Sequence, residues 1–336
     1  MGCSMIVPLD LRALSVDDRS AVADIYRVEC AATAHARPGW VPLDEPARVA
    51  AWQADNGWSH QLVGAFEGDD LIGFASSSTA DDTPDTSWLD VCVLPTHQRR
   101  GIGARLARAA EQAGPAGAER YVASAYLPTA TEIDALVGRF AGPLGYARAT
   151  TETVVELDLA TAELAPAEVA AGTTVSTHLD GVPADLRAQV GVIKGLVDAE
   201  APHGELGWEP TPVSVEDYER ELALWHQQGR TPVESIAVTA DGVVAAWTCV
   251  VVGPDPARPA HVEGTLVLTA HRGAGLGRAV KVASLLAVRD HAGAVRVRTS
   301  SDDANVWMRA INDELGFSPV ESEVLVQKVR RDPSGA

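Results

Sequence analysis

One glycine-rich loop occurs twice in this sequence, at the same place in each half of the chain. The first copy is Gln98–Gly103 (QRRGIG), and the second is Arg272–Gly277 (RGAGLG), 174 residues further on (272 minus 98). A short β-branched run precedes each copy, and apolar residues at helical spacing follow it. Backbone N–H groups at the start of a helix form a site for a phosphate group, and adjacent arginines add positive charge. The repeat therefore predicts a duplicated ligand-binding fold.

The residues around the two loops predict the same order of elements in each half. In the first half we expect a strand over 6–12, helices over 16–30 and 46–55, hairpin strands over 62–66 and 71–75, and a strand over 88–93. In the second half we expect helices over 188–200 and 215–228, hairpin strands over 236–239 and 243–247, and a strand over 264–268. The alanine-rich segment between them contains Pro166 and Gly172 and predicts a linker. We therefore expect domains at 5–158 and 173–330, joined by residues 159–172.

Length and charge limit the kinds of protein that this chain can be. A chain of 336 residues is long enough for two domains that each bury a core. The formal net charge of −19 argues against a nucleic-acid-binding protein, because neutralising phosphates needs a basic face. The four cysteines are scattered without a CxxC pair, and His203 has no cysteine or histidine at ligand spacing. We expect reduced thiols and no metal site.

Nothing in the sequence predicts a membrane protein. No apolar run reaches the length of a membrane-spanning helix. The first residues, Met1–Ile6, superficially resemble an acylation signal, but Ile6 stands where that signal has Ser or Thr. We expect a cytoplasmic monomer or homodimer with no membrane or nucleic-acid partner.

Two common phosphate-binding motifs do not fit the loops. A P-loop needs GxxxxGK[ST], which neither copy contains. A dinucleotide fingerprint needs GxGxxG after the first strand of a domain, but Leu106 stands at the third glycine of the first copy and the second copy reads GxGxG. The pattern that fits is [Q/R]-x-x-G-x-[G/A] directly after a strand, which is Val91–Pro95 in the first half and Leu266–Thr269 in the second.

These loops resemble those of the GNAT N-acetyltransferase superfamily. In the second half, residues Thr299–Met308 and Ile311–Phe317 also look like the asparagine-bearing helix of that superfamily, which ends in Leu-Gly-Phe. The first half has only Arg139–Tyr146 in that place. The resemblance covers nearly the whole chain, in a tandem layout similar to that of mycothiol synthases. It implies an α/β (α+β) fold with two tandem GNAT-like domains, each a mixed, mostly antiparallel central sheet flanked by helices.

The resemblance also implies acetyl-CoA, a coenzyme A thioester, as the cofactor. The loops would bind its diphosphate, and its amide-rich arm would pair like an extra strand with backbone at Val91–Val93 or Val267–Thr269. The expected cofactor-binding residues of the first half are Val91, Val93, Gln98, Arg99, Arg100, Gly101, Ile102, Gly103 and Ala104. Those of the second half are Val267, Thr269, Arg272, Gly273, Ala274, Gly275, Leu276, Gly277, Arg278 and Asn305.

The candidate catalytic residues are Glu263 and Asn312. Many relatives place a carboxylate where Glu263 stands, to take the proton of an ammonium group; the alternative is a solvated glutamate at a strand end. Asp90 is its counterpart in the first half. Many relatives also place a tyrosine four residues before the glycine of Leu-Gly-aromatic, where this chain has Asn312 and Ala141. We therefore do not expect a tyrosine general acid. The alternative to a catalytic role is that Asn312 forms a hydrogen bond to the cofactor or holds the end of the helix.

The irregular segments supply candidates for the acceptor pocket. These are His35, Arg37, Trp40 and Trp58 in the first half, and Glu200, His203, Glu205, Trp208 and Glu209 in the second. Trp247 and Trp307 are expected in the core. We expect an acyl-CoA-dependent N-acetyltransferase that acts on a small amine, with catalysis in the second half. The first half would be degenerate, binding acyl-CoA without turnover or serving mainly as a scaffold. The alternative is a non-catalytic protein that binds or senses acyl-CoA.

Overall fold

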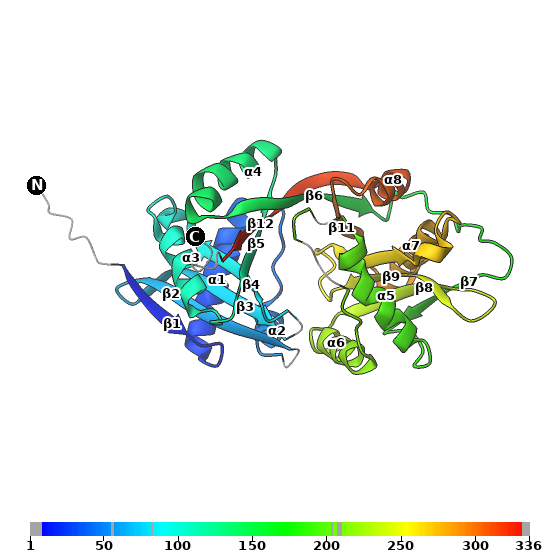
Figure 1. Cartoon of the computed structure of the whole chain (residues 1–336), viewed down its shortest axis with the longest axis horizontal. Helices are drawn as coiled ribbons and strands as arrows, with labels where there is room; N and C mark the ends of the chain where they lie inside the picture. The colour runs from blue at the N-terminus through cyan, green and yellow to red at the C-terminus, as the bar shows by residue number, and fades with distance from the viewer. Residues whose placement is uncertain (1–8, 55–56, 82, 203, 207–209, 331–336) are drawn as a thin grey trace, which may run out of the picture. The chain divides into compact units, whose positions relative to one another are not determined.

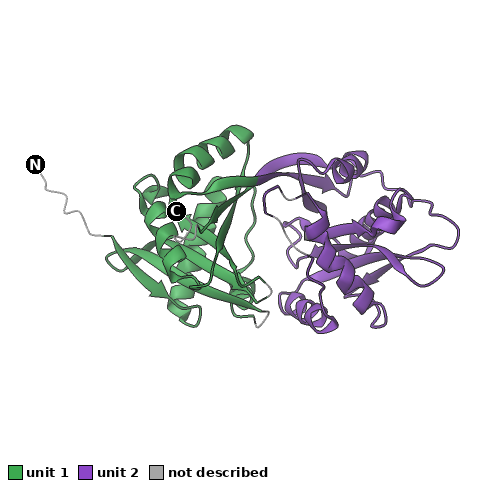
Figure 2. Ribbon diagram, viewed as in Figure 1, with its two compact units in different colours: residues 1–149, 324–336 green, residues 150–323 purple. Residues whose placement is uncertain are grey.

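The computed structural model describes residues 9–54, 57–81, 83–202, 204–206 and 210–330. The segment Met1–Ile6 and the acceptor candidates His203, Trp208 and Glu209 lie outside these residues. The chain divides into two compact units, coloured separately in Figure 2. Unit 1 comprises residues 1–149 and 324–336, and unit 2 comprises residues 150–323.

Unit 1 has a mixed sheet whose strands follow the order β1-β2-β3-β4-β5-β12 (Figure 1). The first four strands pair antiparallel, and β4 pairs with β5 in parallel. Its elements are β1 (Asp10–Leu14), α1 (Arg19–Ala36), α2 (Glu45–Trp52), β2 (Trp58–Glu67), β3 (Asp70–Ala80), β4 (Thr86–Val93), η1 (Pro95–His97), α3 (Ile102–Ala113), β5 (Arg120–Leu127), α4 (Ala130–Leu136), η2 (Val137–Ala141) and η3 (Gly142–Leu144).

Helices cover both faces of this sheet because successive strand residues point to opposite sides. On one face, Val63 of β2 packs in the same cluster as Leu106 of α3. On the other face, Leu62 and Phe74 pack with Ile25 of α1. The loop that joins β4 to α3 therefore leaves the sheet on the α3 side, and α1 and α2 lie across the sheet from it.

Unit 2 repeats this arrangement, with strands in the order β6-β11-β10-β9-β8-β7 and a parallel pair at β10 and β11. On one face Ile193 and Trp225 pack with Trp247, and on the other Val280 packs with Ala246. Its elements are β6 (Ala147–Asp158), β7 (Thr174–Leu179), α5 (Arg187–Glu200), α6 (Val215–Gln227), β8 (Thr231–Val238), β9 (Val244–Val252), β10 (Ala260–Val267), η4 (Thr269–His271), α7 (Leu276–Ala287), η5 (Val288–Ala292), β11 (Arg296–Asp302), α8 (Val306–Glu314) and β12 (Ser318–Val329).

The two units are not continuous stretches of chain. Strand β6 follows the elements of unit 1, yet residues 152–158 pair antiparallel with residues 296–302 of β11 in unit 2. The chain then ends with β12, whose residues 324–329 belong to unit 1, where Val324 and Val326 join the core. The sequence patterns did not predict this exchange. The domain limits that we predicted from the sequence, 5–158 and 173–330, follow the repeat along the chain, and they stay a prediction.

The predicted fold class is confirmed. In each unit the strand pairing is mixed and mostly antiparallel, and helices flank the strands. Residues 159–172, where a linker was expected, form no helix or strand. Cys30, Cys92 and Cys249 are free thiols. In the part of the chain that the structure describes, no helix is both long enough and apolar enough to cross a bilayer.

Candidate functional site

The first glycine loop forms a tight turn between β4 and α3. Helix α3 begins at Ile102, and its N-cap Gly101 has φ +80°, a left-handed conformation that favours glycine. Arg99 also has a positive φ, +63°. Gln98 Nε2 donates to the carbonyl oxygen of Val93 at 3.1 Å and ties the loop to the end of the strand. The N–H groups of the first turn of α3 have no acceptor within the helix, so they are available to an anion.

Beside this loop, β4 and β5 separate. Their parallel pairing covers Thr86–Trp88 against Arg120–Val122 and extends no further toward the loop. On its other edge β4 stays paired with β3 as far as Val93, and Leu94 N donates to Ile72 O at 2.9 Å. Because backbone groups alternate between the edges of a strand, those of Val91 and Val93 face the separation. An extended ligand with amide groups can pair there, and the pairing of a cofactor with this edge stays a prediction.

A cavity of about 960 Å³ runs from the loop along this separation. The predicted residues that line it are Val91, Val93, Gln98, Arg99, Gly101, Gly103 and Ala104, and the acceptor candidates are His35, Arg37 and Trp40. Trp58 is not among its lining residues and is 39% exposed. All residues that line the cavity belong to unit 1. The cavity thus joins the loop, the separated strands and one set of acceptor candidates.

The wall of the cavity formed by α1, α2 and the adjacent strands carries two acids and an arginine. Arg48 of α2 donates to both oxygens of Glu29 on α1, at 3.0 and 2.6 Å, and its guanidinium lies 4.4 Å from the ring centre of Trp52. Ser76 Oγ donates to Asp90 Oδ2 at 3.4 Å. Within the described ranges, no group of three or more His, Cys, Asp or Glu could hold a metal ion.

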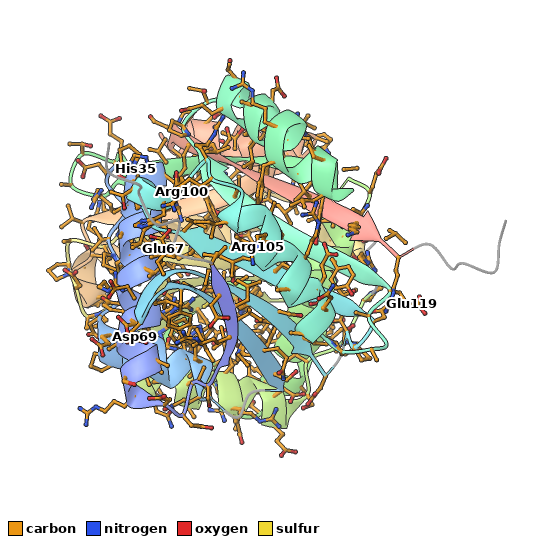
Figure 3. The ribbon with its side chains drawn as sticks, turned by 90° about the vertical axis from the view of Figure 1, so that its left-hand side faces the viewer. His35, Glu67, Asp69, Arg100, Arg105 and Glu119 are labelled. Carbon is orange, nitrogen blue, oxygen red and sulfur yellow. The ribbon has the colours of Figure 1, made fainter. Side chains whose placement is uncertain are left out.

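Arg100, the other arginine of the first loop, pairs with an acid of β2. Figure 3 shows Arg100 beside Glu67, and the two form an ion pair. The second oxygen of Glu67 lies 3.5 Å from His97 Nε2. Arg100 is not among the residues that line the cavity, whereas Arg99 is. Glu67 therefore offsets part of the positive charge that the sequence places at this loop.

The second loop has the same backbone design in unit 2. Helix α7 begins at Leu276 after the N-cap Gly275, whose φ is +72°. Arg272 Nε donates to Val267 O at 3.1 Å, which repeats the bond that Gln98 makes in unit 1. The parallel pairing of β10 with β11 covers only two residue pairs, from Ala260↔Val297 to His261↔Arg298.

Three side chains among the cofactor-binding candidates of unit 2 have partners within the protein. Arg272 forms an ion pair with Glu200, and Arg278 Nε donates to Glu314 Oε1 at 2.7 Å. Thr269 lies in η4, beyond the end of β10. Asn305 caps helix α8, where its Oδ1 accepts from Met308 N at 3.2 Å. Their roles in cofactor binding stay predictions.

Asn312, a candidate catalytic residue, is 2% exposed and bonded to a buried lysine. Its Oδ1 accepts from Lys281 Nζ at 2.5 Å, and its Nδ2 donates to Ser301 Oγ at 3.5 Å. Lys281 is 1% exposed, and this burial lowers its pKa to about 7. The sequence shows Lys281 only as a charged residue inside an apolar helix. Asn312 thus contacts an unusual group, and its catalytic role stays a prediction.

Glu263, the other candidate, lies at an irregularity in β10. The pairing of β10 with β9 shifts between Val262 and Gly264, so Glu263 is the extra residue of a bulge. Its Oε1 lies 3.4 Å from Arg230 Nη2, and its side chain is 31% exposed. A bulge can turn a side chain toward a ligand. The role of Glu263 as a base also stays a prediction.

The two tryptophans expected in the core differ. Trp247 is 2% exposed, which confirms the prediction, but Trp307 is 83% exposed, so that prediction is wrong. The less exposed residues of α8 and its flanks recur at a spacing of three or four, as Asn305, Met308 and Asn312. Trp307 falls outside this stripe, and helix periodicity rather than residue type decided its exposure.

Sequence reasoning missed several residues of the cavity. Glu29 and Arg48 lie on predicted helices, but nothing in the sequence shows that these helices face one another. Ser124 and Tyr126 line the cavity from β5, and Arg37 stacks over the Tyr126 ring at 3.7 Å. For Ser124 and Tyr126, the available signal was their position in the strand that follows the loop helix of a GNAT fold.

Comparisons with known proteins agree with this architecture. Residues 23–130 match the model of the acetyltransferase (GNAT) family. A tandem GNAT protein from the clavulanic acid biosynthesis pathway is 23% identical, with a TM-score of 0.77 over 97% of this chain and 100% of that one. A GCN5-related N-acetyltransferase from Sphaerobacter thermophilus is 17% identical, with a TM-score of 0.64 over 96% of each chain. No curated protein matches the chain significantly. Residues 23–130 are thus similar to the acetyltransferase (GNAT) family, and the chain as a whole has the fold of tandem GNAT proteins.

Proposed function

We propose that this protein is an N-acetyltransferase that moves the acetyl group of acetyl-CoA to the amine of a small molecule. The observation that carries the proposal is the cavity of unit 1, which connects the glycine loop, the separation between β4 and β5, and Asp90. These three features suit, in turn, a diphosphate, an amide-bearing arm and an ammonium group.

The residues of unit 1 fit acetyl-CoA at each of these places. The turn at Gly101 and the first N–H groups of α3 suit the diphosphate, and Arg99 adds charge there. The backbone groups of Val91 and Val93 suit the amides of the arm. The second loop has the same backbone, so we propose that unit 2 binds a second coenzyme.

The chemistry follows from where the acceptor can lie. The thioester supplies an activated carbonyl and a thiolate leaving group. We assign Asp90 to accept the proton of the acceptor ammonium, directly or through water, so that the neutral nitrogen can attack the carbonyl. Main-chain N–H groups along the separated edge of β4 stabilise the negative charge that develops on the carbonyl oxygen. The rest of the rate enhancement comes from holding the amine next to the thioester in the geometry for attack. As the C–S bond breaks, the nitrogen loses its second proton through water to the departing thiolate, which leaves as the thiol.

This proposal places transfer in unit 1, whereas the sequence favoured the second half, with Glu263 and Asn312. The reason is geometric: Asp90 and the first loop line one cavity together. The alternative, a protein that binds or senses acyl-CoA without transfer, draws support from Ala141 and Asn312, which stand where many relatives have a tyrosine.

A pair of loop substitutions tests the proposal. At Gly101 a Cβ would meet open space, so in Gly101→Glu the carboxylate extends into the anion site and the positive φ adds strain. We expect thiol release with acetyl-CoA and a panel of amines to fall at least about 100-fold in this variant. The matched Gly275→Glu should reduce bound coenzyme from two per chain to one by calorimetry. If the wild type binds acetyl-CoA but releases no thiol with any amine, the sensor is the correct function. If Gly101→Glu retains full turnover, transfer does not occur in unit 1.

A further inference from the structure

Equivalent positions in the two units can be identified from strand pairing and distance along the chain to each loop. Phe74 pairs with Cys92, which stands six residues before Gln98. Trp247 pairs with Leu266, which stands six residues before Arg272. Phe74 and Trp247 are therefore equivalent. By the same count, Ser76 and Asp90 of unit 1 correspond to Cys249 and Gly264 of unit 2.

These equivalent positions are open in unit 1 and packed in unit 2. Phe74, Ser76 and Asp90 line the cavity of unit 1. In unit 2, Trp247 and Cys249 are 2% and 0% exposed. A Cβ added to Gly264 would lie 3.0 Å from the Trp247 ring and 3.2 Å from the side chain of Val197, so α5 packs closely against β10 here. Described side chains of unit 2 thus fill the place where unit 1 has the acceptor end of its cavity.

The centre of this packing is the ammonium group of Lys194 on α5. Its Nζ lies 5.5, 5.2 and 5.3 Å from the ring centres of Tyr218, Trp225 and Trp247. It also forms an ion pair with Glu221 of α6, and the Lys194 side chain is only 9% exposed. We call the three rings and Glu221 the cation cage. Several aromatic faces and a carboxylate around one position form a recognition site for an organic ammonium ion.

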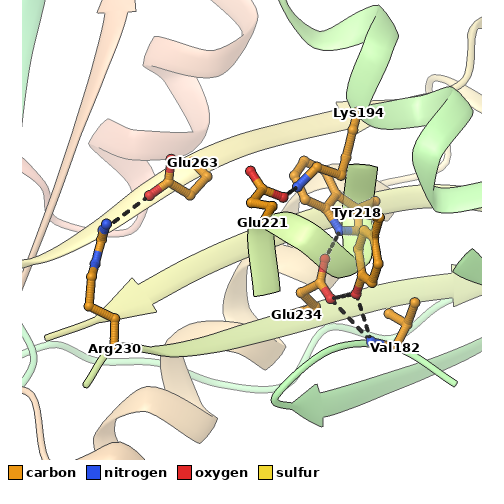
Figure 4. A network of polar contacts seen from close by, with 8 residues as sticks. Val182, Lys194, Tyr218, Glu221, Arg230, Glu234 and Glu263 are labelled. Atoms are coloured by element: carbon orange, nitrogen blue, oxygen red, sulfur yellow. Dashed lines mark hydrogen bonds and ion pairs between the residues drawn. The ribbon is translucent and has the colours of Figure 1, made fainter. Parts of the chain in front are cut away.

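The cage is held in place by a buried carboxylate. Glu234, which is 0% exposed, accepts hydrogen bonds from Tyr218 Oη, from Trp247 Nε1 at 2.8 Å and from Val182 N at 3.1 Å (Figure 4). These bonds fix the orientation of two of the three rings. Burial would lower the pKa of Lys194, but the neighbouring carboxylates outweigh it and raise that pKa, so Lys194 remains charged.

We propose that the cation cage is the acceptor-ammonium position of unit 2 and that Lys194 of the same chain occupies it. Unit 2 then keeps its coenzyme loop but does not admit an amine acceptor at this position, and Lys194 is the residue that determines this difference. This inference rests on the proposed function only for the meaning of the acceptor position, because recognition of an ammonium ion by the cage can be measured without any turnover.

In the first test, Lys194 is replaced by alanine in the full chain, and a small ammonium ion is added to take the place of the missing side-chain atoms. Lys194→Ala lacks three carbon atoms and the ammonium nitrogen, which are the same heavy atoms that propylammonium contains. We expect the variant to unfold roughly 5–15 °C below the wild type, because Glu221 loses its partner. Millimolar propylammonium chloride should raise its Tm in a saturable way, whereas n-propanol, or potassium chloride at equal ionic strength, should not. Lack of a saturable rise, or an equal rise with propanol, would overturn the cage.

Two matched variants sharpen this test. Lys328 also has a carboxylate partner, Glu111 at 2.7 Å, but among the described residues a single ring, that of Tyr146, lies near its Nζ, at 5.5 Å. Lys328→Ala should therefore not respond to propylammonium. Adding Trp225→Leu to Lys194→Ala removes one ring of the cage, and the response should disappear.

A second measurement does not depend on how Lys194→Ala folds. In the Gly101→Glu variant Lys194 is in place, so we expect one bound coenzyme per chain and amine-dependent thiol release at least about 100-fold below that of the wild type. Greater amine-dependent release that is lost when Gly275→Glu is added would show that unit 2 admits an acceptor, and the inference would be wrong. If the wild type itself neither binds acetyl-CoA nor releases thiol, the proposed function fails, while the propylammonium result still decides whether the cage recognises an ammonium ion.

Discussion

Lys281 and Asp90 are polar side chains in very different surroundings. Lys281 lies inside unit 2, where its Nζ contacts Asn312 Oδ1 at 2.5 Å, Met308 Sδ at 3.6 Å and the Phe317 ring at 5.2 Å. None of these three groups carries a compensating negative charge. Asp90, by contrast, is an exposed carboxylate on β4 that lines the cavity of unit 1. The first affects stability, and the second belongs to the proposed reaction.

Replacing Lys281 by Met should change how stability depends on pH. The pKa of Lys281 is about 7 in the folded protein against a usual 10.5, so between these values the unfolded chain binds a proton that the folded chain does not. Wild-type stability therefore rises as pH increases from 7 to 10, by up to about 1.4 kcal/mol per pH unit. Lys281→Met lacks this dependence and should exceed the wild type by about 1–3 kcal/mol at pH 7.

Urea unfolding at pH 7, 8 and 9 measures this difference, which should shrink as the pH rises. Lys328→Met is the control, because Lys328 has Glu111 as an ion-pair partner and its loss should give no gain. An advantage of Lys281→Met that stays constant with pH would mean that Lys281 keeps its proton in the folded state.

Asp90→Asn tests the assigned base. The amide cannot accept the proton of the acceptor ammonium, so kcat should fall about 100- to 10,000-fold. The KM for acetyl-CoA should change little, because Asp90 lies away from the loop. Asp69→Asn, at a fully exposed turn residue (107% side-chain exposure), is the matched control and should retain wild-type kcat. Equal rates in the two variants would remove Asp90 from the mechanism.

The strand–loop–helix element is built alike in both units but differs in its charges. A side chain from the first position of the loop donates to the strand end, from Gln98 in one unit and from Arg272 in the other. Arg100, Arg272 and Arg278 each pair with a carboxylate. The backbone therefore provides the shared part of the anion site, and the acids around it adjust its strength.

Glu67→Gln should strengthen coenzyme binding at the first loop. The substitution frees Arg100 from its ion pair and removes a negative charge beside the diphosphate position. The Kd for acetyl-CoA at unit 1 should fall about two- to fivefold at low salt, and the gain should shrink at high salt. The Kd is measured by calorimetry in the Gly275→Glu variant, in which the unit 2 site should no longer bind coenzyme. Glu119→Gln removes the same charge far from Arg100 (Figure 3) and should leave the Kd unchanged. A higher Kd in Glu67→Gln, which means weaker binding, would show that Glu67 positions Arg100 rather than neutralising it.

Across the whole chain, the exchange of strands makes the two units depend on each other for folding. Unit 1 takes Val324 and Val326 from the end of the chain, and these side chains are 0% and 7% exposed. Unit 2 begins with β6, which directly follows the elements of unit 1. Neither half of the sequence therefore contains all the strands of one unit.

A chain that ends at Phe317 should lose a folded unit 1. It lacks β12, so one edge of the sheet is exposed and the core loses two buried valines. We expect loss of cooperative unfolding for this unit and of acetyl-CoA binding at its loop, by calorimetry. A chain that ends at Arg330 keeps β12 and should behave like the full chain. Unchanged unfolding of the shorter chain would contradict the role of β12.

The sequence alone determined the elements that short-range interactions specify. The loops, the hairpins and the loop helices were predicted because glycines at positive φ, β-branched runs and helical spacing act within a few residues. The same patterns indicated the tandem GNAT fold and the backbone conformation of both glycine loops.

Only the tertiary structure decided which segments meet. The pairing of β6 with β11, the cavity beside Asp90 and the packing around Lys194 each join parts of the chain that no local pattern links. Trp307 and Trp247 show the same limit, because two similar residues have opposite exposures. The physical reason is that burial depends on how side chains from distant elements fit together, and a single sequence carries no record of those partners.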